Sequence, residues 1–275
     1  MNNEMVSIYI PTHNRKSLLE RAILSASKQT YKNIEIIVCD DGSTDGTTEL
    51  VSAMMQEDSR IVYRRNDVPQ GACSARNLGI FSAKGEFITG LDDDDEFTEC
   101  RIERFLEKWN DSISFICSNF KNSYPDRLST HYIQWRDKTF EPKFLLYSNI
   151  ASNQIFTLTK RLQYIGGFDV SVKRLQDWDT WLKIAFEFGS FLRLKKSTYI
   201  MHHEHENTTR VSNSYGLDLA FLDFIEKNNK LLTNDSLSYL RFHISRIRKT
   251  QAFSSSLYWS IRRKNPLYVI EFFKI

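Results

Sequence analysis

Residues 86–97 read EFITGLDDDDEF, an apolar run with β-branched and aromatic members that leads into four consecutive aspartates. The run predicts a strand over residues 86–91, with the aspartates 92–95, here called the acid run, at its carboxyl end. Neighbouring carboxylates repel one another unless a cation lies among them or some are protonated. Mg²⁺ and Mn²⁺ prefer oxygen ligands and commonly bridge a protein carboxylate and a diphosphate. The position at a strand end therefore favours a metal site over the alternative, a solvated acidic turn.

Strands and helices alternate on the N-terminal side of the acid run. Apolar, β-rich runs predict strands over residues 6–10, 34–39, 61–63 and 86–91. Apolar residues at helical spacing predict helices over about residues 18–26 and 72–83, and between them a helix that carries Leu50, Val51 and Met54. Thr44 or Asp45 is the expected cap of the second helix. Such alternation predicts an α/β fold, in which helices cover both faces of a mostly parallel central sheet.

The pattern becomes mixed on the C-terminal side of the acid run. Thr98 is the expected cap of a helix that extends to about Trp109, and strands are predicted over residues 113–117 and 154–159. A further helix carries Trp178 and ends at Gly189. From about residue 215 the chain is predicted to form helices rich in Lys, Arg and aromatic residues. We expect one α/β domain over residues 1–212 and a helical C-terminal extension over residues 213–275.

Polar residues follow each of the first strands, and ligands of parallel α/β sheets bind at the carboxyl ends of the strands. Pro11, Thr12, His13 and Arg15 follow the first strand, and residues 40–43, DDGS, follow the second. Together with the acid run they predict one polar rim. Neither GxGxxG nor GxxxxGK[ST] occurs in the chain, so phosphates bound at this rim must be held by other groups.

Several of these residues also have an ordinary structural explanation. Asp, Gly and Ser are turn formers, so residues 40–43 could simply connect a strand to a helix. Asp177 could cap the helix that carries Trp178. His202, His203 and His205 could bind a metal, although histidines after a strand more often pack or lie at the surface. The sequence alone leaves these alternatives open.

Composition excludes some classes of function. A net charge of +3 over 275 residues gives no argument for nucleic-acid binding. The four cysteines show no CxxC pair and no metal-ligand spacing, so we expect free thiols in a reducing compartment. The N-terminus shows no signal-peptide pattern, and no stretch of about 18 apolar residues is present. We therefore expect a cytoplasmic protein that is soluble or peripheral to a membrane.

Five motifs, in order, resemble glycosyltransferase family 2 over roughly residues 5–210. They are IYIPTHNR at residues 8–15, IEIIVCDDGSTDGT at 34–47, GACSARNLG at 71–79, EFITGLDDDDEF at 86–97, and GGFD at 166–169 followed by LQDWDTW at 175–181. The resemblance implies a GT-A fold, a nucleotide-sugar donor such as a UDP-sugar, a Mn²⁺ or Mg²⁺ ion, and inversion at the anomeric carbon. It also implies that residues 1–95 bind the nucleotide and residues 96–212 the acceptor.

The resemblance also assigns roles to single residues. It implies that the nucleotide is bound by residues from all three strand ends, with Asp41 accepting from the uracil ring. These residues are Pro11, Thr12, His13, Arg15, Asp41, Arg76, Asp92 and Asp93. Asp92 and Asp94 form the DxD pair, Asp94 is the expected direct metal ligand, and His203 is a further candidate ligand. Asp177 takes the position of the general base. The family usually has Glu-Asp where this chain has Gln176-Asp177, and this difference could alter acceptor binding.

The chemistry of inverting transfer agrees with this assignment. The reaction needs a base within hydrogen-bond reach of the acceptor hydroxyl, on the face opposite the leaving group. It also needs charge neutralised on the departing diphosphate, which a metal supplies as a Lewis acid. One carboxylate cluster for the metal and a separate aspartate on another element meet both needs. The resemblance points to a hexosyltransferase of bacterial surface polysaccharide or O-antigen synthesis, with a saccharide or lipid-linked saccharide as acceptor.

Two other functions are weighed against this one. A sugar-phosphate nucleotidyltransferase would need a Gly- and Arg-rich loop with a lysine after the first strand, where this chain has Thr12-His13-Asn14. A non-catalytic sugar-nucleotide binding protein would need no base at Asp177.

The C-terminal extension mixes basic and aromatic residues, which suits the cytoplasmic face of an anionic membrane. The basic residues are Arg241, Arg246, Arg248, Lys249, Arg262, Arg263 and Lys264. The alternative is that the aromatic residues pack on the catalytic domain or on a second subunit of a homo-oligomer.

Overall fold

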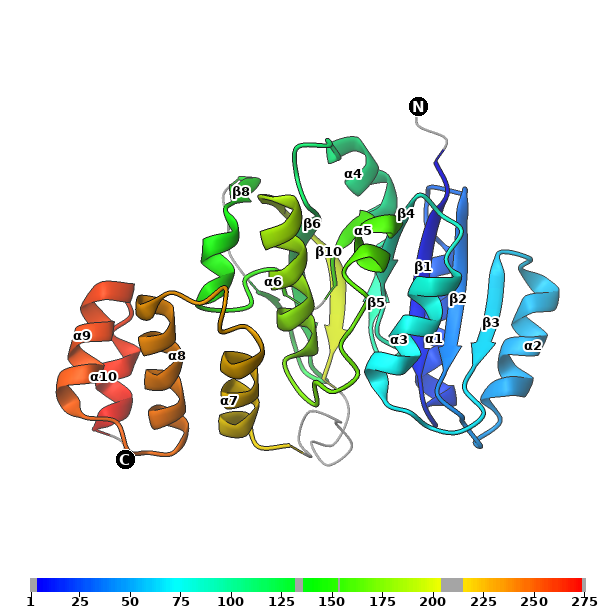
Figure 1. Cartoon of the computed structure of the whole chain (residues 1–275). Coiled ribbons are helices and arrows are strands. Elements are labelled where there is room, and N and C mark those ends of the chain that lie inside the picture. Colours follow the sequence, from blue (N-terminus) through cyan, green and yellow to red (C-terminus); the bar gives the residue numbers. More distant parts are fainter. Residues whose placement is uncertain (1–3, 132–135, 153, 204–214, 274–275) are drawn as a thin grey trace. The chain divides into compact units, whose positions relative to one another are not determined.

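The computed structural model describes residues 4–131, 136–152, 154–203 and 215–273 (Figure 1). The chain divides into two compact units. The first comprises residues 1–145, 149–171 and 176–206, and the second comprises residues 146–148, 172–175 and 207–275. The first unit contains the sheet, and the second contains the C-terminal helices.

The N-terminal half of the sheet is parallel, in the order β3-β2-β1-β4. Its strands are β1 (Val6–Thr12), β2 (Ile34–Asp40), β3 (Ile61–Arg65) and β4 (Phe87–Gly90). Every residue of β1 and β2 is buried, which agrees with their continuous apolar sequence, because helices cover both faces of a parallel sheet. The parallel register brings the carboxyl ends of β1 and β2 level with each other, with Thr12 beside Asp40.

The other half of the sheet is mixed. Strand β9 (Phe156–Leu158) lies antiparallel between β4 and β6 (Ile116–Ser123), and β6 pairs in parallel with β10 (Phe191–His202). Three short strands add antiparallel pairs: β5 (Glu96–Phe97), β7 (Leu128–His131) and β8 (Lys138–Phe140). The predicted α/β class is confirmed, with the antiparallel strands confined to the second half.

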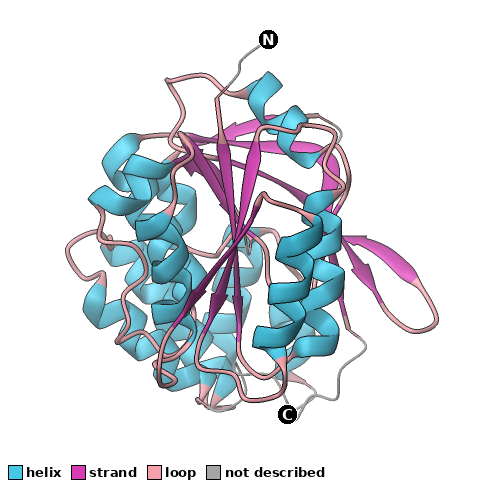
Figure 2. Ribbon diagram, turned by 90° about the vertical axis from the view of Figure 1, so that its right-hand side faces the viewer, coloured by secondary structure: helices cyan, strands magenta, loops and turns pink. Residues whose placement is uncertain are grey.

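Helices cover both faces of the sheet (Figure 2). Helices α1 (Lys16–Ser27), α2 (Thr47–Glu57) and α4 (Arg101–Lys108) share one hydrophobic cluster with Ile8 and Ile10 of β1. Helix α3 (Ala72–Ser82) contacts β1 and β2 on the opposite face. Gly79 allows this close approach, because a Cβ atom there would lie 2.5 Å from Tyr9 Cβ and 2.7 Å from Cys39 Sγ.

The helix ends test three sequence predictions. The Asp45 carboxylate accepts from the N–H of Thr47, the first residue of α2, although Gly46 holds the N-cap position. The predicted Thr98 cap is wrong, because α4 begins at Arg101 after Cys100, and Gln29 Oε1 accepts from the N–H of Ile102, the second residue of α4, over 3.2 Å. Helix α6 (Gln176–Phe188) ends before Gly189, whose φ of 101° is the left-handed conformation that glycine adopts readily.

The remaining helices include α5 (Thr159–Tyr164) in the first unit and four helices in the second. Those four are α7 (Leu217–Lys227), α8 (Asn234–Ile247), α9 (Phe253–Arg263) and α10 (Leu267–Phe272). The second unit has its own aromatic core of Tyr239, Phe242, Trp259 and Tyr268. Among the described helices, none combines the length and the apolar character that crossing a membrane would require.

Candidate active site

The predicted rim forms at the carboxyl ends of β1, β2 and β4. Thr12 at the end of β1 donates from Oγ1 to Asp93 Oδ2 over 2.7 Å, and its carbonyl accepts from the Asp41 N–H over 2.9 Å. His13, which is exposed, has Nδ1 2.8 Å from the Asp41 carbonyl. Pro11 is buried within β1. The three strand-end clusters therefore meet, as the parallel register requires.

The acid run alternates between buried and partly exposed carboxylates. Asp93 and Asp95 are buried, whereas the side chains of Asp92 and Asp94 keep 23% and 21% of their surface exposed. Asp95 Oδ2 accepts from the Tyr199 hydroxyl over 2.8 Å, and its Oδ1 accepts from the His202 N–H over 2.9 Å. Two aspartates thus hold the turn in place, and the other two face outward.

Burial shifts the titration of the inward pair. It raises the pKa of Asp93 to about 7, with Arg15 acting in the opposite direction. It also raises the pKa of Asp95 well above the usual range, and the neighbouring charges of Asp94 and Asp92 add to the shift. Burial thus disfavours the charged form of both inward carboxyl groups, which lessens the repulsion within the acid run.

Arginines relieve the rest of the repulsion. Arg15 Nη1 lies 3.1 Å from both Asp93 Oδ1 and Asp94 Oδ2. Arg76 Nη2 lies 3.2 Å from Asp92 Oδ1. Arg21 Nη2 donates to the Asp94 carbonyl over 2.6 Å. Arg15 and Arg76, both predicted to contact the nucleotide, thus lie beside the two outward carboxylates.

The donor set fits a divalent cation that takes most of its ligands from substrate and water. No group of three or more His, Cys, Asp or Glu side chains is arranged to hold a metal within the described residues. Asp92 and Asp94 nevertheless present partly exposed carboxylates, and Mg²⁺ is commonly bound through one or two carboxylates together with substrate phosphates. These two residues are the ones that would hold a cation.

The histidines at the end of β10 have protein partners. His202 Nε2 lies 2.7 Å from Glu96 Oε2. His203 Nε2 lies 2.8 Å from Asn122 Oδ1, and its ring stacks on Tyr124 at a centroid distance of 4.6 Å. His205 lies outside the described residues. A metal-binding role for His203 stays a prediction.

Asp177 lies in the first turn of α6, not at its cap. Its Oδ1 is buried and accepts no hydrogen bond from any residue that the structure describes. Burial raises the pKa of Asp177 to about 7; the positive charge of Arg76 opposes this shift, and the negative charge of Asp92 adds to it. A carboxylate with a pKa close to neutrality suits a general base at physiological pH.

Arg76 connects Asp177 to the acid run. Its Nη1 donates to Gln176 Oε1 over 3.0 Å, its Nη2 pairs with Asp92, and its guanidinium lies 5.2 Å from the centre of the Phe168 ring. Burial alone would lower its pKa, but Asp177 and Asp92 raise it above the usual value. Gln176, where the family usually has Glu, is thus a neutral acceptor for this cation.

The carboxylates of the Asp40-Asp41 turn are held by Ser43 of the same loop and by residues 65–71. Asp40 accepts from the Ser43 N–H over 2.8 Å and pairs with Arg65 Nη1 at 2.7 Å. Asp41 accepts from the N–H groups of Gln70 and Gly71, over 2.8 and 2.7 Å, and from Asn66 Nδ2 over 2.8 Å. These bonds fix the loop that enters α3. The predicted contact of Asp41 with uracil stays a prediction.

The sequence did not reveal three residues that position the acid run. Gln154, just before β9, donates from Nε2 to Asp92 Oδ1 over 3.1 Å. Tyr199 of β10 binds Asp95, and Arg21 of α1 binds the Asp94 carbonyl. Tyr199 and Gln154 are 107 and 62 residues from Asp92 in the chain, so no local motif could mark them.

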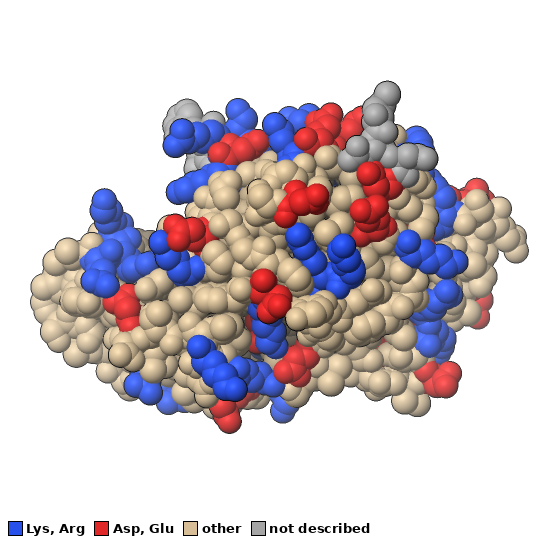
Figure 3. All heavy atoms as spheres, turned by 45° about the horizontal axis from the view of Figure 1, so that its top comes forward, with Lys and Arg blue, Asp and Glu red and all other residues tan. Residues whose placement is uncertain are grey.

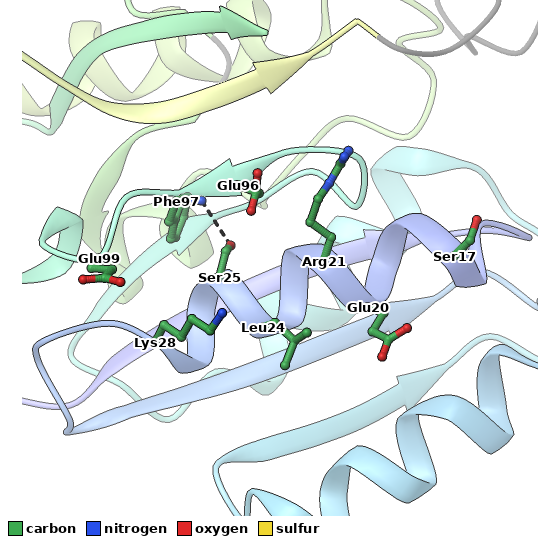
Figure 4. A pocket seen from close by; sticks show the side chains of 9 residues that line it. All are labelled: Ser17, Glu20, Arg21, Leu24, Ser25, Lys28, Glu96, Phe97 and Glu99. Carbon is green, nitrogen blue, oxygen red and sulfur yellow. Dashed lines mark hydrogen bonds between the residues drawn. The ribbon is translucent and has the colours of Figure 1, made fainter. Parts of the chain in front are cut away.

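A separate pocket of about 490 Å³ lies between α1 and β5 (Figure 4). Its lining mixes both signs of charge with apolar groups: Ser17, Glu20, Arg21, Leu24, Ser25, Lys28, Glu96, Phe97 and Glu99. None of the predicted donor-site residues lines it, and Arg21 connects it to the acid run through the Asp94 carbonyl.

Comparison with known proteins agrees with this geometry. A sequence model described as "Glycosyl transferase family 2" matches residues 7–162, which include the rim, the acid run and Arg76. The chain belongs to glycosyl transferase family 2. It is therefore a glycosyltransferase, and its predicted family and enzyme class are confirmed.

Relatives of this glycosyltransferase are named for polysaccharide synthesis. The "Putative colanic acid biosynthesis glycosyl transferase WcaA" of Escherichia coli K12 is 34% identical over 258 residues, which cover 90% of this chain and 89% of that protein. The "UDP-Glc:alpha-D-GlcNAc-diphosphoundecaprenol beta-1,3-glucosyltransferase WfaP" of Escherichia coli is 41% identical over 120 residues, covering 42% of this chain and 46% of that protein.

A solved structure supports the GT-A fold of this glycosyltransferase. The mannosyltransferase PcManGT of Pyrobaculum calidifontis, in complex with GDP-Man and Mn²⁺, matches with a TM-score of 0.63 and 16% identity. The match covers 97% of this chain and 85% of that structure. At this identity the likeness concerns the fold, and the Mn²⁺ is a property of the neighbour.

Proposed function

We propose that this glycosyltransferase transfers a hexose, with inversion, from a UDP-sugar to a hydroxyl of a lipid-linked saccharide. The observation that carries the proposal is the buried, unpaired oxygen of Asp177, whose charge interacts with Arg76, the partner of the outward Asp92. A binding protein would have no use for an unsatisfied carboxylate, whose burial is costly.

The rim would bind the donor. Thr12, His13 and Asp41 lie where the nucleoside is expected, and Arg15 and Arg76 lie beside the carboxylates that face the diphosphate. Asp92 and Asp94 would hold a divalent cation, Mn²⁺ or Mg²⁺, which neutralises charge on the diphosphate when bound. The two arginines would add positive charge on the same side, where the leaving group accumulates negative charge.

Asp177 would act on the acceptor. Its unpaired Oδ1 takes the proton from the acceptor hydroxyl as the oxygen of that hydroxyl bonds to the anomeric carbon. On the opposite face, the bond from the anomeric carbon to the diphosphate oxygen breaks and the nucleoside diphosphate departs. The two events on opposite faces of one carbon invert its configuration.

The acceptor class is proposed from the relatives. WfaP is named for a diphosphoundecaprenol-linked acceptor, and WcaA for the biosynthesis of colanic acid. A polyprenyl diphosphate is anchored in a membrane, so this chain would act at the cytoplasmic face of the cell membrane. A nucleotide-sugar donor and a lipid-linked saccharide are thus its proposed partners.

The test is a screen of UDP- and GDP-sugars against extracted lipid-linked saccharides, with release of nucleoside diphosphate and the configuration of the product as readouts. Wild-type chain should release UDP only when an acceptor is present, and Asp177→Asn should release it at a strongly reduced rate. Asp179→Asn is the matched control, because Asp179 lies on the same helix but is paired with Lys183 at 2.6 Å. Acceptor-dependent release at a rate near that of wild type in Asp177→Asn would refute the assigned base.

A further inference from the structure

Helices α9 and α10 leave a row of large apolar side chains at the surface. These are Phe253, Leu257 and Ile261 on α9, and Leu267, Ile270 and Phe273 on or directly after α10. We call this set the α9–α10 ridge. Ile261 and Phe273 are 71% and 72% exposed, although both would normally be buried. The spacing of four residues on α9 and three on α10 places each row on one side of its helix.

The two rows form one surface. The Phe253 ring at the start of α9 lies 5.4 Å from the ring of Phe272 and 5.7 Å from that of Phe273, at the end of α10. The inner sides of both helices are already filled, because Trp259 and Tyr268 pack with Tyr239 and Phe242. The ridge is therefore additional to the core of the unit, and contiguous exposed apolar surface of this kind marks an interaction site.

Most of the basic residues near the ridge have partners within the same unit. Arg246 pairs with Glu271, Arg248 with Asp218, and Arg262 with Asp235. Arg263 stacks over Tyr147, with its guanidinium carbon 4.3 Å from the ring centre. The attraction to an anionic surface is thus weaker than the sequence suggests, and the ridge is the larger feature left for a partner.

The charge that remains is positive. Residues 253–273, which carry the ridge, contain three basic residues, Arg262, Arg263 and Lys264, and one acid, Glu271. Glu271 pairs with Arg246, and Arg262 with Asp235. Lys264 is exposed and directly follows α9, three residues after Ile261. Figure 3 shows that large uncharged stretches separate the basic and acidic side chains on the face that it draws. Two copies that met ridge to ridge would bring Arg263 and Lys264 of each copy together, and Glu271, the one acid of residues 253–273, is already paired with Arg246.

We propose that the α9–α10 ridge inserts into the interfacial layer of an anionic lipid bilayer, with Arg262, Arg263 and Lys264 at the headgroups. Helices of 11 and 6 residues are too short to span a bilayer but suit a position in the plane of its surface. The proposal rests on the proposed function, in which the acceptor is anchored in a membrane. It differs from purely electrostatic attachment, because the apolar side chains contribute most of the binding.

Vesicle flotation of the full chain tests the ridge. Wild type should float with phosphatidylcholine vesicles containing phosphatidylglycerol, and high salt should reduce the bound fraction without abolishing it. Leu257→Ser combined with Ile261→Ser should weaken binding about tenfold or more. Leu219→Ser combined with Leu222→Ser is the matched control, since those α7 side chains are 44% and 42% exposed, close to the 43% of Leu257. The control pair should float like wild type.

Three outcomes would overturn the proposal: a wild type that does not float, a ridge variant that floats like wild type, or complete loss of binding at high salt. A wild-type dimer in light scattering that the ridge variant converts to a monomer, without a change in flotation, would assign the ridge to a second copy. Phe273→Ser repeats the test on α10 in case the double variant is misfolded by circular dichroism. Flotation needs no catalysis, so transfer to a water-soluble acceptor analogue tests the proposed function separately.

Discussion

The turn after β2 and the turn after β4 are both rich in aspartate, but their carboxylates differ in how fully the protein satisfies them. Asp40 is completely buried, and Asp41 accepts three hydrogen bonds from residues 66–71. After β4, only Asp93 and Asp95 are buried in this way, while Asp92 and Asp94 stay partly exposed beside Arg76 and Arg15. A buried carboxylate whose oxygens accept hydrogen bonds from the protein holds a loop in place. A carboxylate that stays partly exposed is open to a ligand.

The largest effect should come from the open carboxylates. Asp94→Ala should reduce transfer by at least about a thousandfold, because it removes an oxygen ligand and a partner of Arg15. EDTA should have the same effect on wild type, with recovery on addition of Mn²⁺ or Mg²⁺. The readout is release of nucleoside diphosphate with a defined acceptor. Asp67→Ala, at an exposed position, is the control, and full activity in chelator would contradict the metal assignment.

Asp177→Asn should lower the transfer rate by about 10²–10⁴-fold, the usual contribution of a positioned base. Donor affinity, measured by calorimetry with UDP, should change little, because Asp177 is assigned to the acceptor. A variant that turns over normally would reduce Asp177 to a structural residue of α6.

A substitution in the turn after β2 should instead lower the stability of the fold. Asp40→Asn should lower the free energy of unfolding by about 2–4 kcal/mol, because the Asp40 carboxylate is completely buried and its charge holds Arg65 and the Ser43 N–H. Urea denaturation measures this loss. Asp58→Asn, whose own carboxylate is partly exposed, should cost no more than about 1 kcal/mol. Equal losses for the two variants would mean that burial of the turn contributes nothing.

The smallest expected effect is the change of the transfer rate and of stability with pH. Because the pKa of Asp177 is raised to about 7, the transfer rate should fall about tenfold per pH unit below that value as the base becomes protonated. Stability should change in the opposite direction. A carboxyl whose pKa is higher in the folded than in the unfolded chain favours folding at low pH, and this contribution is lost as the pH rises through 7.

Asp177→Asn separates the two pH effects. It should remove the fall of the transfer rate at low pH. The free energy of unfolding should still decrease as the pH rises, because burial also raises the pKa of Asp93 to about 7. Rate profiles and urea titrations at pH 5 and pH 8 provide the comparison. An acid limb that persists in the residual activity of the variant would assign the titrating group to another residue.

The same contrast separates what the sequence could predict from what it could not. Strands β1, β2 and β4 were predictable, because their runs are apolar and end in polar residues, and the parallel order then brings those ends together. The residues that form hydrogen bonds with the carboxylates could not be predicted. Tyr199 reaches Asp95 from β10, a strand whose pairing with β6 shifts register between Leu194 and Tyr199. Such a shift leaves no local signature.

Charge in the C-terminal region was misjudged for the same reason. Arg246, Arg248 and Arg262 form a basic cluster in the sequence, but each has an acidic partner 25 to 30 residues away or on another helix. Counting charges along the chain therefore overestimates the free positive surface. The sequence predicts helices rich in aromatic residues here, but only packing distinguishes Trp259, which is buried, from Ile261, which is exposed.

Gly79 limits how this catalytic site can change during evolution. Any other residue at position 79 would bring its Cβ to 2.5 Å from the Cβ of Tyr9, an atom that every residue except glycine possesses. Trimming neighbouring side chains would therefore not make room, and α3 would have to move away from β1. Arg76 lies one helical turn from Gly79 on α3, so it would move as well, away from Asp92. We therefore expect changes in donor or acceptor preference of the enzyme to arise at other positions, while position 79 stays glycine.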